Sequence, residues 1–268
     1  MSTNLHLKPK VSVIMPVFNN GSFVKESIQS VLEQSFKEFE FLIIDDCSTD
    51  NSLKVISKFK DKRIKIFKNK KRKGLAWCLN YLQKQSKSEY IARMDGDDVS
   101  YKERLKEQFN FLKLNPEYVL VGGWAKIINN KGNIIGEMTP PIKYLDVRKT
   151  ILSNNTFVHP AVMFKKSIVQ KVGGYNEKLF YSQDYDIFLR LVSKYPCANL
   201  KNYLVKFRWN PDFKKQKQQH KTALEIRIKA IRYYGYSKIG YVKLLKPFVY
   251  YSIPIFIKKI YWNNKFKN

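Results

Sequence analysis

The alternation of short apolar runs with amphipathic stretches over the first hundred residues constrains this fold more than any other sequence feature. Four apolar runs have the length of buried strands, and the segments between them place apolar residues at helical spacing. The runs are 11–15, 39–44, 64–67 and 90–94. Strands that alternate with helices form an open, mostly parallel sheet with helices on both faces. We therefore expect a Rossmann-like α/β fold.

Polar residues follow three of these predicted strands. The first strand ends at Pro16 and an Asn-rich loop, the second at Asp45-Asp46, and the fourth at Asp95-Gly96-Asp97-Asp98. Ligands of open α/β sheets bind beyond the carboxyl ends of the strands. We therefore expect these three loops to meet at one rim and to form a binding site there.

The Asp95-Gly96-Asp97-Asp98 segment favours a metal site. Carboxylates this close repel one another, and a divalent cation that also binds phosphate oxygens offsets that repulsion. The alternative is a plain turn, because Asp-Gly is also a common turn sequence. Ser100 and Glu103 have the spacing of a capping box, which predicts that a helix begins there.

The second half of the chain has a different rhythm. We expect strands over 118–128, 158–164 and 203–209, and helices over 183–195 and 212–235. The predicted division is a domain over residues 1–210 and a basic helical region over 211–268. Within the domain, residues 10–115 form a nucleotide-binding half and residues 116–210 an acceptor-binding half.

Several single residues in the chain have two interpretations each. Asp184, at the start of a predicted helix, fits a dipole-stabilising acid or a general base equally well. His159 and Trp124 fit structural roles or contacts with a sugar, and the structural role is the commoner one. Asp45-Asp46 fits either a solvated turn or contacts with a nucleotide. The basic residues 70–73 either steer a diphosphate or form a solvated loop.

The charge of the chain bears on its partners. The formal net charge is +28, and residues 201–268 hold 17 Lys and Arg against two acids. Such a surface attracts nucleic acids, phosphorylated glycans or anionic membranes. No basic-aromatic recognition motif accompanies the charge, so we expect no nucleic-acid partner. Residues 240–268 mix apolar, aromatic and lysine residues in a way that suits the interface of an anionic membrane.

The cysteines and the apolar runs bear on the compartment. Three Cys residues without a Cys-x-x-Cys pair argue against a disulfide framework and against a zinc site. We expect neither a signal peptide nor a membrane-spanning helix, because no apolar run is long enough. The expected location is the cytoplasm, with peripheral attachment to the inner face of the cell membrane as a further expectation.

Five segments, taken together and in this order, resemble glycosyltransferase family 2, the inverting enzymes of GT-A fold. The resemblance spans Val11 to about Trp209, roughly three-quarters of the chain. The segments that carry it are Val11–Asn20, Ile43–Asp50, Asn69–Asn80, Arg93–Asp98 (the DxD motif), and Gly173–Glu177 with Ser182–Arg190. Cys47 stands where the family usually has Gly.

The resemblance implies a role for each matching residue. Asp184 takes the place of the catalytic base, although Gln183 stands where the family commonly has Glu. Asp95 and Asp97 are the implied ligands of Mg²⁺ or Mn²⁺. The candidate donor-binding residues are Pro16, Val17, Asn19, Asp45, Asp46, Gly74, Asp95 and Gly96. The candidate acceptor or sugar contacts are His159, Trp124 and Gln183.

The implied activity is direct displacement at an anomeric carbon. A sugar, most simply that of a UDP-sugar, passes with inversion from its nucleoside diphosphate to a hydroxyl of a glycan or lipid-linked acceptor. Bacterial capsule or lipooligosaccharide synthesis is the setting that the resemblance implies. The competing interpretations are a nucleotidyltransferase, a non-catalytic sugar-nucleotide-binding protein and a nucleic-acid-binding module. The first normally needs a glycine-rich phosphate loop, which residues 16–21 do not supply.

Overall fold

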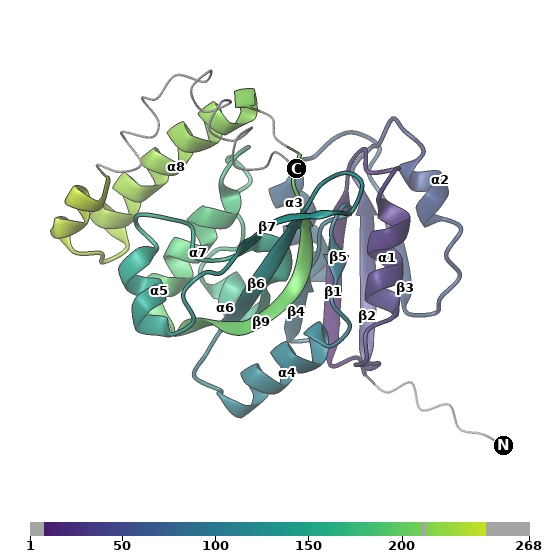
Figure 1. Cartoon of the computed structure of the whole chain (residues 1–268), viewed down its shortest axis with the longest axis horizontal. Helices are drawn as coiled ribbons and strands as arrows, with labels where there is room; N and C mark the ends of the chain where they lie inside the picture. Colours follow the sequence, from purple (N-terminus) through teal and green to yellow (C-terminus); the bar gives the residue numbers. More distant parts are fainter. Residues whose placement is uncertain (1–7, 211–212, 245–268) are drawn as a thin grey trace.

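The computed structural model describes residues 8–210 and 213–244, and it has an α/β architecture (Figure 1). The strands are β1 (Val11–Val17), β2 (Phe39–Asp45), β3 (Ile64–Lys68), β4 (Tyr90–Arg93), β5 (Val99–Ser100), β6 (Leu120–Ile128), β7 (Ile134–Met138), β8 (Met163–Lys165) and β9 (Cys197–Arg208). The helices are α1 (Val24–Leu32), α2 (Ser52–Ile56), α3 (Leu75–Gln85), α4 (Arg104–Leu114), α5 (Tyr144–Thr150), α6 (Lys166–Lys171), α7 (Gln183–Lys194) and α8 (Phe213–Tyr233). Two 3₁₀ turns complete the set, η1 (His159–Ala161) and η2 (Lys238–Leu244).

The nine strands of the described residues belong to one sheet in the order β3-β2-β1-β4-β8-β6-β9-β5, with β7 paired to β6. The first four strands are parallel to one another, whereas β8 is antiparallel to both of its neighbours. Because β1, β2 and β4 run in the same direction, their carboxyl ends lie at one edge of the sheet. The predicted α/β sheet is therefore confirmed, and its rim is where the polar loops were expected.

Alternate residues of the strands build a separate core on each face of the sheet. On β2, Phe41 and Ile43 pack with helices α1 and α4, and Leu42 and Ile44 pack on the face that carries α3 and α7. This two-sided burial explains why the strands read as continuous apolar runs without polar alternation. Helix α8 contributes Ala223, Ile226 and Ala230 to the same core as α7.

Two local predictions are wrong. The predicted strand over 158–164 is the 3₁₀ turn η1 followed by the short strand β8, because Pro160 has no N–H to give to a ladder. The predicted capping box is absent, because Ser100 belongs to β5, which pairs with β9, and α4 begins only at Arg104. The Ser100 amide instead donates to the Ser30 hydroxyl at 2.9 Å.

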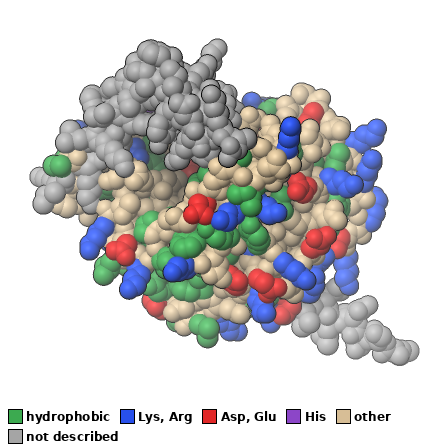
Figure 2. All heavy atoms as spheres, in the orientation of Figure 1, with side chains coloured by type: hydrophobic (Ala, Val, Ile, Leu, Met, Phe, Trp, Pro, Cys, Tyr) green, Lys and Arg blue, Asp and Glu red, His purple; other side chains and the backbone are tan. Residues whose placement is uncertain are grey.

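The C-terminal region is only partly described. Residues 213–233 form the predicted basic helix, whereas most of the predicted membrane-facing segment, 240–268, lies outside the described residues. Figure 2 shows that Lys and Arg side chains are dense on the side of α1, α2 and β3 as well. Among the described helices, none combines the length and the apolar character needed to cross a bilayer.

Candidate functional site

The carboxyl ends of the parallel strands border a hollow of about 440 Å³, which we call the central cleft. Its walls come from the end of β1 and the residues just after it, from the loops after β2, β3 and β4, from the start of α3, from the end of β9, and from α8. The predicted donor-binding or metal-binding residues that line it are Pro16, Val17, Asp46, Gly74, Asp95 and Asp97. Three loops that are far apart in the sequence thus meet at one rim.

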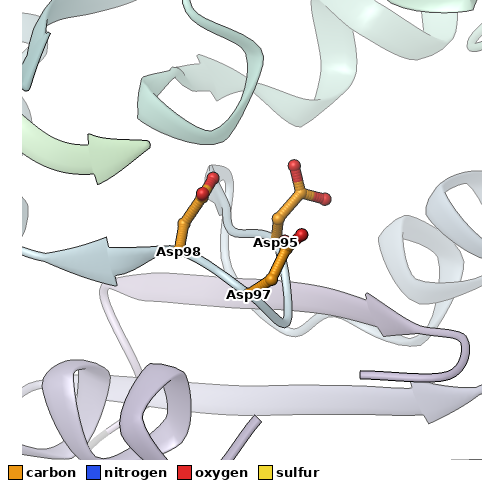
Figure 3. A group of neighbouring side chains, drawn as sticks. All are labelled: Asp95, Asp97 and Asp98. Carbon is orange, nitrogen blue, oxygen red and sulfur yellow. The ribbon is translucent and has the colours of Figure 1, made fainter. Parts of the chain in front are cut away.

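Three carboxylates form an acidic cluster at this rim (Figure 3). Asp95, Asp97 and Asp98 each place an oxygen within 4.8 Å of the others, on the turn between β4 and β5. Burial and the charge of Asp95 raise the pKa of Asp97 to about 6. Burial, together with the charges of Asp95 and Asp97, raises the pKa of Asp98 well above its ordinary value. The cluster therefore favours any cation that binds there.

The acidic cluster has carboxylate oxygens left for such a cation. Asp95 pairs with the guanidinium of Arg93, and one oxygen of Asp98 accepts from the backbone N–H of Arg208 at 2.7 Å. The other oxygen of Asp98 is buried and has no hydrogen-bond partner among the described residues. Carboxylate oxygens are the ligands that Mg²⁺ and Mn²⁺ prefer. The residues present therefore fit a divalent cation.

The carboxylate of Asp46 is used differently, since it accepts three hydrogen bonds from the loop between β3 and α3. One oxygen accepts from the Asn69 amide at 2.7 Å and from the Lys73 N–H at 2.8 Å, and the other accepts from the Gly74 N–H at 2.8 Å. Gly74 has a φ of +91°, which L side chains rarely adopt. Asp46 therefore fixes the shape of the cleft wall. Its neighbour Asp45 is buried behind it and accepts from the Ser48 N–H at 3.1 Å.

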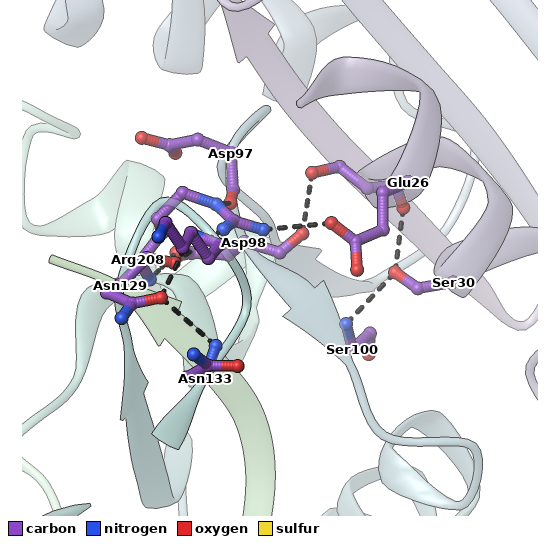
Figure 4. Close-up of polar contacts among 10 residues, drawn as sticks. Glu26, Ser30, Asp97, Asp98, Ser100, Asn129, Asn133 and Arg208 are labelled. Carbon is purple, nitrogen blue, oxygen red and sulfur yellow. Dashed lines mark hydrogen bonds and ion pairs between the residues drawn. The ribbon is translucent and has the colours of Figure 1, made fainter. Parts of the chain in front are cut away.

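Arg208 ties the acidic cluster to two distant parts of the chain (Figure 4). Its guanidinium donates to the Asp97 carbonyl, to the Asn129 carbonyl and to the Glu26 carboxylate, each at 2.8 Å. The guanidinium also lies 4.3 Å from the centre of the Phe23 ring. Because Arg208 is buried and all three nitrogens are engaged, it holds the turn between β4 and β5 in one place.

Asp184 lies at the start of α7, in a second hollow of about 340 Å³. Its carboxylate accepts from the side-chain amide of Asn155 at 3.0 Å. Burial raises the pKa of Asp184, and the N–H of Tyr185 and the charge of Arg93 partly offset this. A carboxylate with a raised pKa is a stronger base than an ordinary aspartate.

Two observations place Asp184 beside the central cleft. Gln219 of α8 lines both the central cleft and the hollow that contains Asp184. The second observation concerns Tyr175. Burial raises the pKa of its phenol, and the charges of Asp184 and Asp95 raise it further, so both carboxylates lie close enough to act on the same phenol. The acidic cluster and Asp184 therefore both lie near Tyr175, although 89 residues separate Asp95 from Asp184 in the sequence.

The remaining predicted site residues lie at varying distances from this centre. His159 places Nε2 2.9 Å from the Tyr175 hydroxyl, and burial together with the charge of Arg93 lowers its pKa well below the ordinary value, so its ring is neutral. Trp124 on β6 lies outside the central cleft and donates to the Pro140 carbonyl at 3.2 Å. Gln183 is buried and lines a third hollow, which is described below.

Two further predicted residues shape the loops around the cleft. The Asn19 side chain accepts from the Thr49 N–H at 2.9 Å, in a left-handed backbone with a φ of +54°. A Cβ at Gly96 would lie 3.2 Å from the Val17 side chain and 3.3 Å from that of Asn20. Gly96 therefore lets the two loops approach closely.

Sequence reasoning missed three residues of this site. Arg93 stands next to the DxD motif, so its position in the sequence could have indicated its pairing with Asp95. Arg208 and Gln219 carry no local signal, because what makes them part of the site is the packing of β9 and α8 against the rim.

Comparisons with known proteins are consistent with this geometry. The sequence model described as Glycosyl transferase family 2 matches residues 12–173. The chain is 35% identical over 212 residues to WbnJ of Escherichia coli, described as an O-antigen biosynthesis glycosyltransferase, covering 76% of this chain and 82% of WbnJ. It is 34% identical over 207 residues to MJ1057 of Methanocaldococcus jannaschii, described as an uncharacterized glycosyltransferase, covering 75% of this chain and 71% of MJ1057.

Solved structures share the fold. Residues 1–349 of S. aureus TarS, in complex with UDP, superpose with a TM-score of 0.67 at 21% identity, covering 86% of this chain and 68% of that one. The mannosyltransferase PcManGT from Pyrobaculum calidifontis, in complex with GDP-Man and Mn²⁺, gives a TM-score of 0.66 at 16% identity, covering 92% and 71%. At these identities the likeness concerns the fold.

Proposed function

The chain belongs to glycosyl transferase family 2, and from this premise we propose that it transfers a sugar from a nucleoside-diphosphate sugar to an acceptor hydroxyl, with inversion. The observation that supports the proposal is that the acidic cluster borders the central cleft while Asp184 lies in an adjoining hollow that shares Gln219 with it. The acidic cluster suits a diphosphate leaving group with its cation, and Asp184 suits proton removal from the attacking hydroxyl.

The residues around the central cleft hold the donor in this proposal. The wall that Asp46 fixes borders the nucleoside, and Leu75 at the start of α3 adds a backbone N–H group at a helix N-terminus. Asp95 and Asp97 would hold Mg²⁺ or Mn²⁺. When bound there, a divalent cation stabilises the negative charge on the departing diphosphate.

Asp184 is the general base in this proposal. Its carboxylate takes the proton of the acceptor hydroxyl as that oxygen attacks the anomeric carbon and the bond to the diphosphate breaks. The Asn155 amide orients the carboxylate, and burial keeps its pKa above that of an ordinary aspartate. A single displacement inverts the anomeric configuration and needs no covalent enzyme intermediate.

The identity of the donor and the setting are parts of the same proposal. The complex of TarS with UDP supports a UDP-sugar, whereas PcManGT binds GDP-Man, so both nucleotides belong in a first test. The description of WbnJ supports a role in bacterial surface-polysaccharide synthesis on a glycan or lipid-linked acceptor. Peripheral attachment of the basic C-terminal region to an anionic membrane would bring the enzyme to a lipid-linked acceptor.

A turnover screen of sugar nucleotides with Mn²⁺ or Mg²⁺ tests the proposal, with wild type and Asp184→Asn compared on the donor that is used. We expect Asp184→Asn to lose at least about a hundredfold in turnover, the scale of general-base catalysis, and to bind the donor as wild type does. Asp146→Asn is the matched control, because Asp146 is also a first-turn acid of a helix but is exposed. Retained turnover in Asp184→Asn would contradict the assignment of the base. Donor binding without transfer or hydrolysis in wild type would favour the non-catalytic alternative.

A further inference from the structure

A third hollow of about 330 Å³ adjoins the central cleft and has no role in the reaction as proposed so far. One wall is the end of the β3–α3 loop and the first turn of α3, residues 72–77, and the other is the loop 177–181 before α7. We call it the side hollow. Its volume is within the ~300–1,000 Å³ of small-ligand sites, and none of the three acidic-cluster residues lines it.

The side hollow opens where an acceptor has to sit. Gln183, the residue before Asp184, lines it, and so does Gln219, which also lines the central cleft and the Asp184 hollow. The three hollows therefore meet near Gln219. A molecule whose hydroxyl reaches Asp184 has the side hollow as room for its neighbouring groups.

The walls of the side hollow carry an excess of positive charge. Arg72, Lys73 and Lys178 line it, and within the described residues none of the three forms an ion pair. Its one acid among the described lining residues, Glu177, already accepts from the Asn80 amide at 2.7 Å. Cations that form no ion pair with the described residues remain available to an anionic ligand.

Aromatic side chains hold part of this charge in place and offer flat faces. The Arg72 guanidinium lies 4.0 Å from the centre of the Phe18 ring and 5.7 Å from that of Phe180. Trp77 stacks on Tyr81 with ring centres 5.1 Å apart, so its orientation is fixed. Phe180 lines the side hollow and is 62% exposed, so its ring is accessible to a ligand there. The C–H face of a sugar ring packs against such rings.

We infer that the side hollow is an acceptor subsite that takes a glycan carrying a phosphate or diphosphate, with Lys73 and Lys178 binding the anion and Phe180 and Trp77 packing against the sugar. This inference rests on the proposed transferase function and adds the chemical class of its acceptor. The phosphate has two chemical sources, a phosphorylated glycan or the diphosphate of a lipid carrier, and both present the same group to these lysines.

Calorimetry on the full chain tests the subsite while UDP and Mn²⁺ saturate the central cleft. The probes are glucose 1-phosphate, its uncharged match methyl glucoside, and glucose linked through a diphosphate to a decyl chain. We expect glucose 1-phosphate to bind at least about fivefold more tightly than methyl glucoside, as partly exposed charge-assisted contacts allow. Tighter binding of the decyl diphosphate than of glucose 1-phosphate assigns the anion to a lipid carrier, and equal binding assigns it to the glycan.

Variants locate the binding. Lys178→Glu should abolish the preference for glucose 1-phosphate. Lys84→Glu is the matched charge reversal, in the last turn of α3 and outside the side hollow, and should keep the preference. Phe180→Ala should weaken both glucose 1-phosphate and methyl glucoside to the same degree, because it removes a sugar contact and no charge. Equal binding of the two sugars to wild type, or equal loss in Lys178→Glu and Lys84→Glu, would overturn the inference while leaving the donor site intact. Failure of UDP to bind in the first step would instead count against the proposed function.

Discussion

Two acidic segments follow strands β2 and β4, which lie on either side of β1 in the sheet, yet the chain uses their carboxylates in opposite ways. Asp46, after β2, receives three hydrogen bonds from the loop that follows β3. Asp95, Asp97 and Asp98, after β4, crowd together, and an oxygen of Asp98 has no hydrogen-bond partner among the described residues. The carboxylate of Asp46 is engaged within the fold, whereas the crowded carboxylates after β4 leave an oxygen of Asp98 available to a cation.

The two kinds of carboxylate have different roles: one shapes the site, and the other binds a ligand within it. A carboxylate whose oxygens are already engaged contributes to a ligand site by fixing the wall that the ligand meets. A carboxylate whose pKa is raised by its neighbours stores unfavourable energy that a divalent cation releases. Substitutions in the two segments should therefore produce different kinds of defect.

The largest expected effect is on turnover, from Asp97→Ala. Loss of this carboxylate should lower cation-dependent turnover by at least about a hundredfold, at or above the upper end of the range for residues around a metal site. Its measurement is the rate of sugar transfer or donor hydrolysis across a titration of Mn²⁺. Turnover near that of wild type, or wild-type activity that is unaffected by chelator, would contradict the role of the acidic cluster.

Asp46→Ala should instead weaken the fold. The substitution leaves the N–H groups of Lys73 and Gly74 and the Asn69 amide without their acceptor, which costs about 2 kcal/mol in the free energy of unfolding. Urea unfolding of the cation-free protein measures this, and Asp97→Ala serves as the comparison because it should not destabilise. An Asp46→Ala protein that is as stable as wild type but has lost donor binding would show that Asp46 contacts the donor directly.

The contrast between the two segments was only partly readable from the sequence. The strand–helix alternation predicted the parallel strands and therefore the meeting of Asp46, Asp95 and Asp97 at one rim. It could not show that the Asp46 carboxylate is engaged in hydrogen bonds within the chain, because two of its partners are backbone N–H groups, which every residue except proline has. The partnership of Arg208 with Asp97 and Asp98 spans 110 residues and depends on the pairing of β5 with β9.

The two wrong local predictions have different origins. Ser100 and Glu103 satisfy a capping-box pattern locally, but tertiary pairing of β5 with β9 takes Ser100 into the sheet. Residues 158–164 have the composition of a strand, but Pro160 cannot donate to a ladder and the chain turns before β8 begins.

Arg208→Lys should have an intermediate effect. A lysine keeps the positive charge but cannot reach the Asp97 carbonyl, the Asn129 carbonyl and the Glu26 carboxylate together. We expect cation affinity to fall about tenfold, as for groups that orient metal ligands, while donor affinity without cation is unchanged. Calorimetric titration with Mn²⁺ measures the cation affinity. Lys206→Arg, on the same strand, is the control for exchanging a lysine and an arginine. Unchanged cation affinity would mean that the turn between β4 and β5 keeps its shape without the hydrogen bonds of Arg208.

The smallest expected effect is on the pH dependence of stability. The pKa of Asp97 is about 6 in the folded protein against 3.8 for an ordinary aspartate, so the folded state binds more protons between these values. Its contribution to stability is therefore largest below pH 3.8 and is lost as the pH rises through about 6. Asp97→Asn has no carboxylate to ionise and does not lose this stability. The melting temperature of Asp97→Asn minus that of wild type, measured in chelator, should therefore increase from pH 4 to pH 7. A constant difference between the two proteins would contradict the raised pKa.

The most direct test of the account is calorimetric titration of UDP into wild type and Asp97→Ala, each with Mn²⁺ and with chelator. The account predicts that Mn²⁺ strengthens UDP binding to wild type and leaves its binding to Asp97→Ala unchanged. Equal UDP affinity of wild type with Mn²⁺ and with chelator would contradict the claim that the acidic cluster is built to take a cation together with the donor diphosphate.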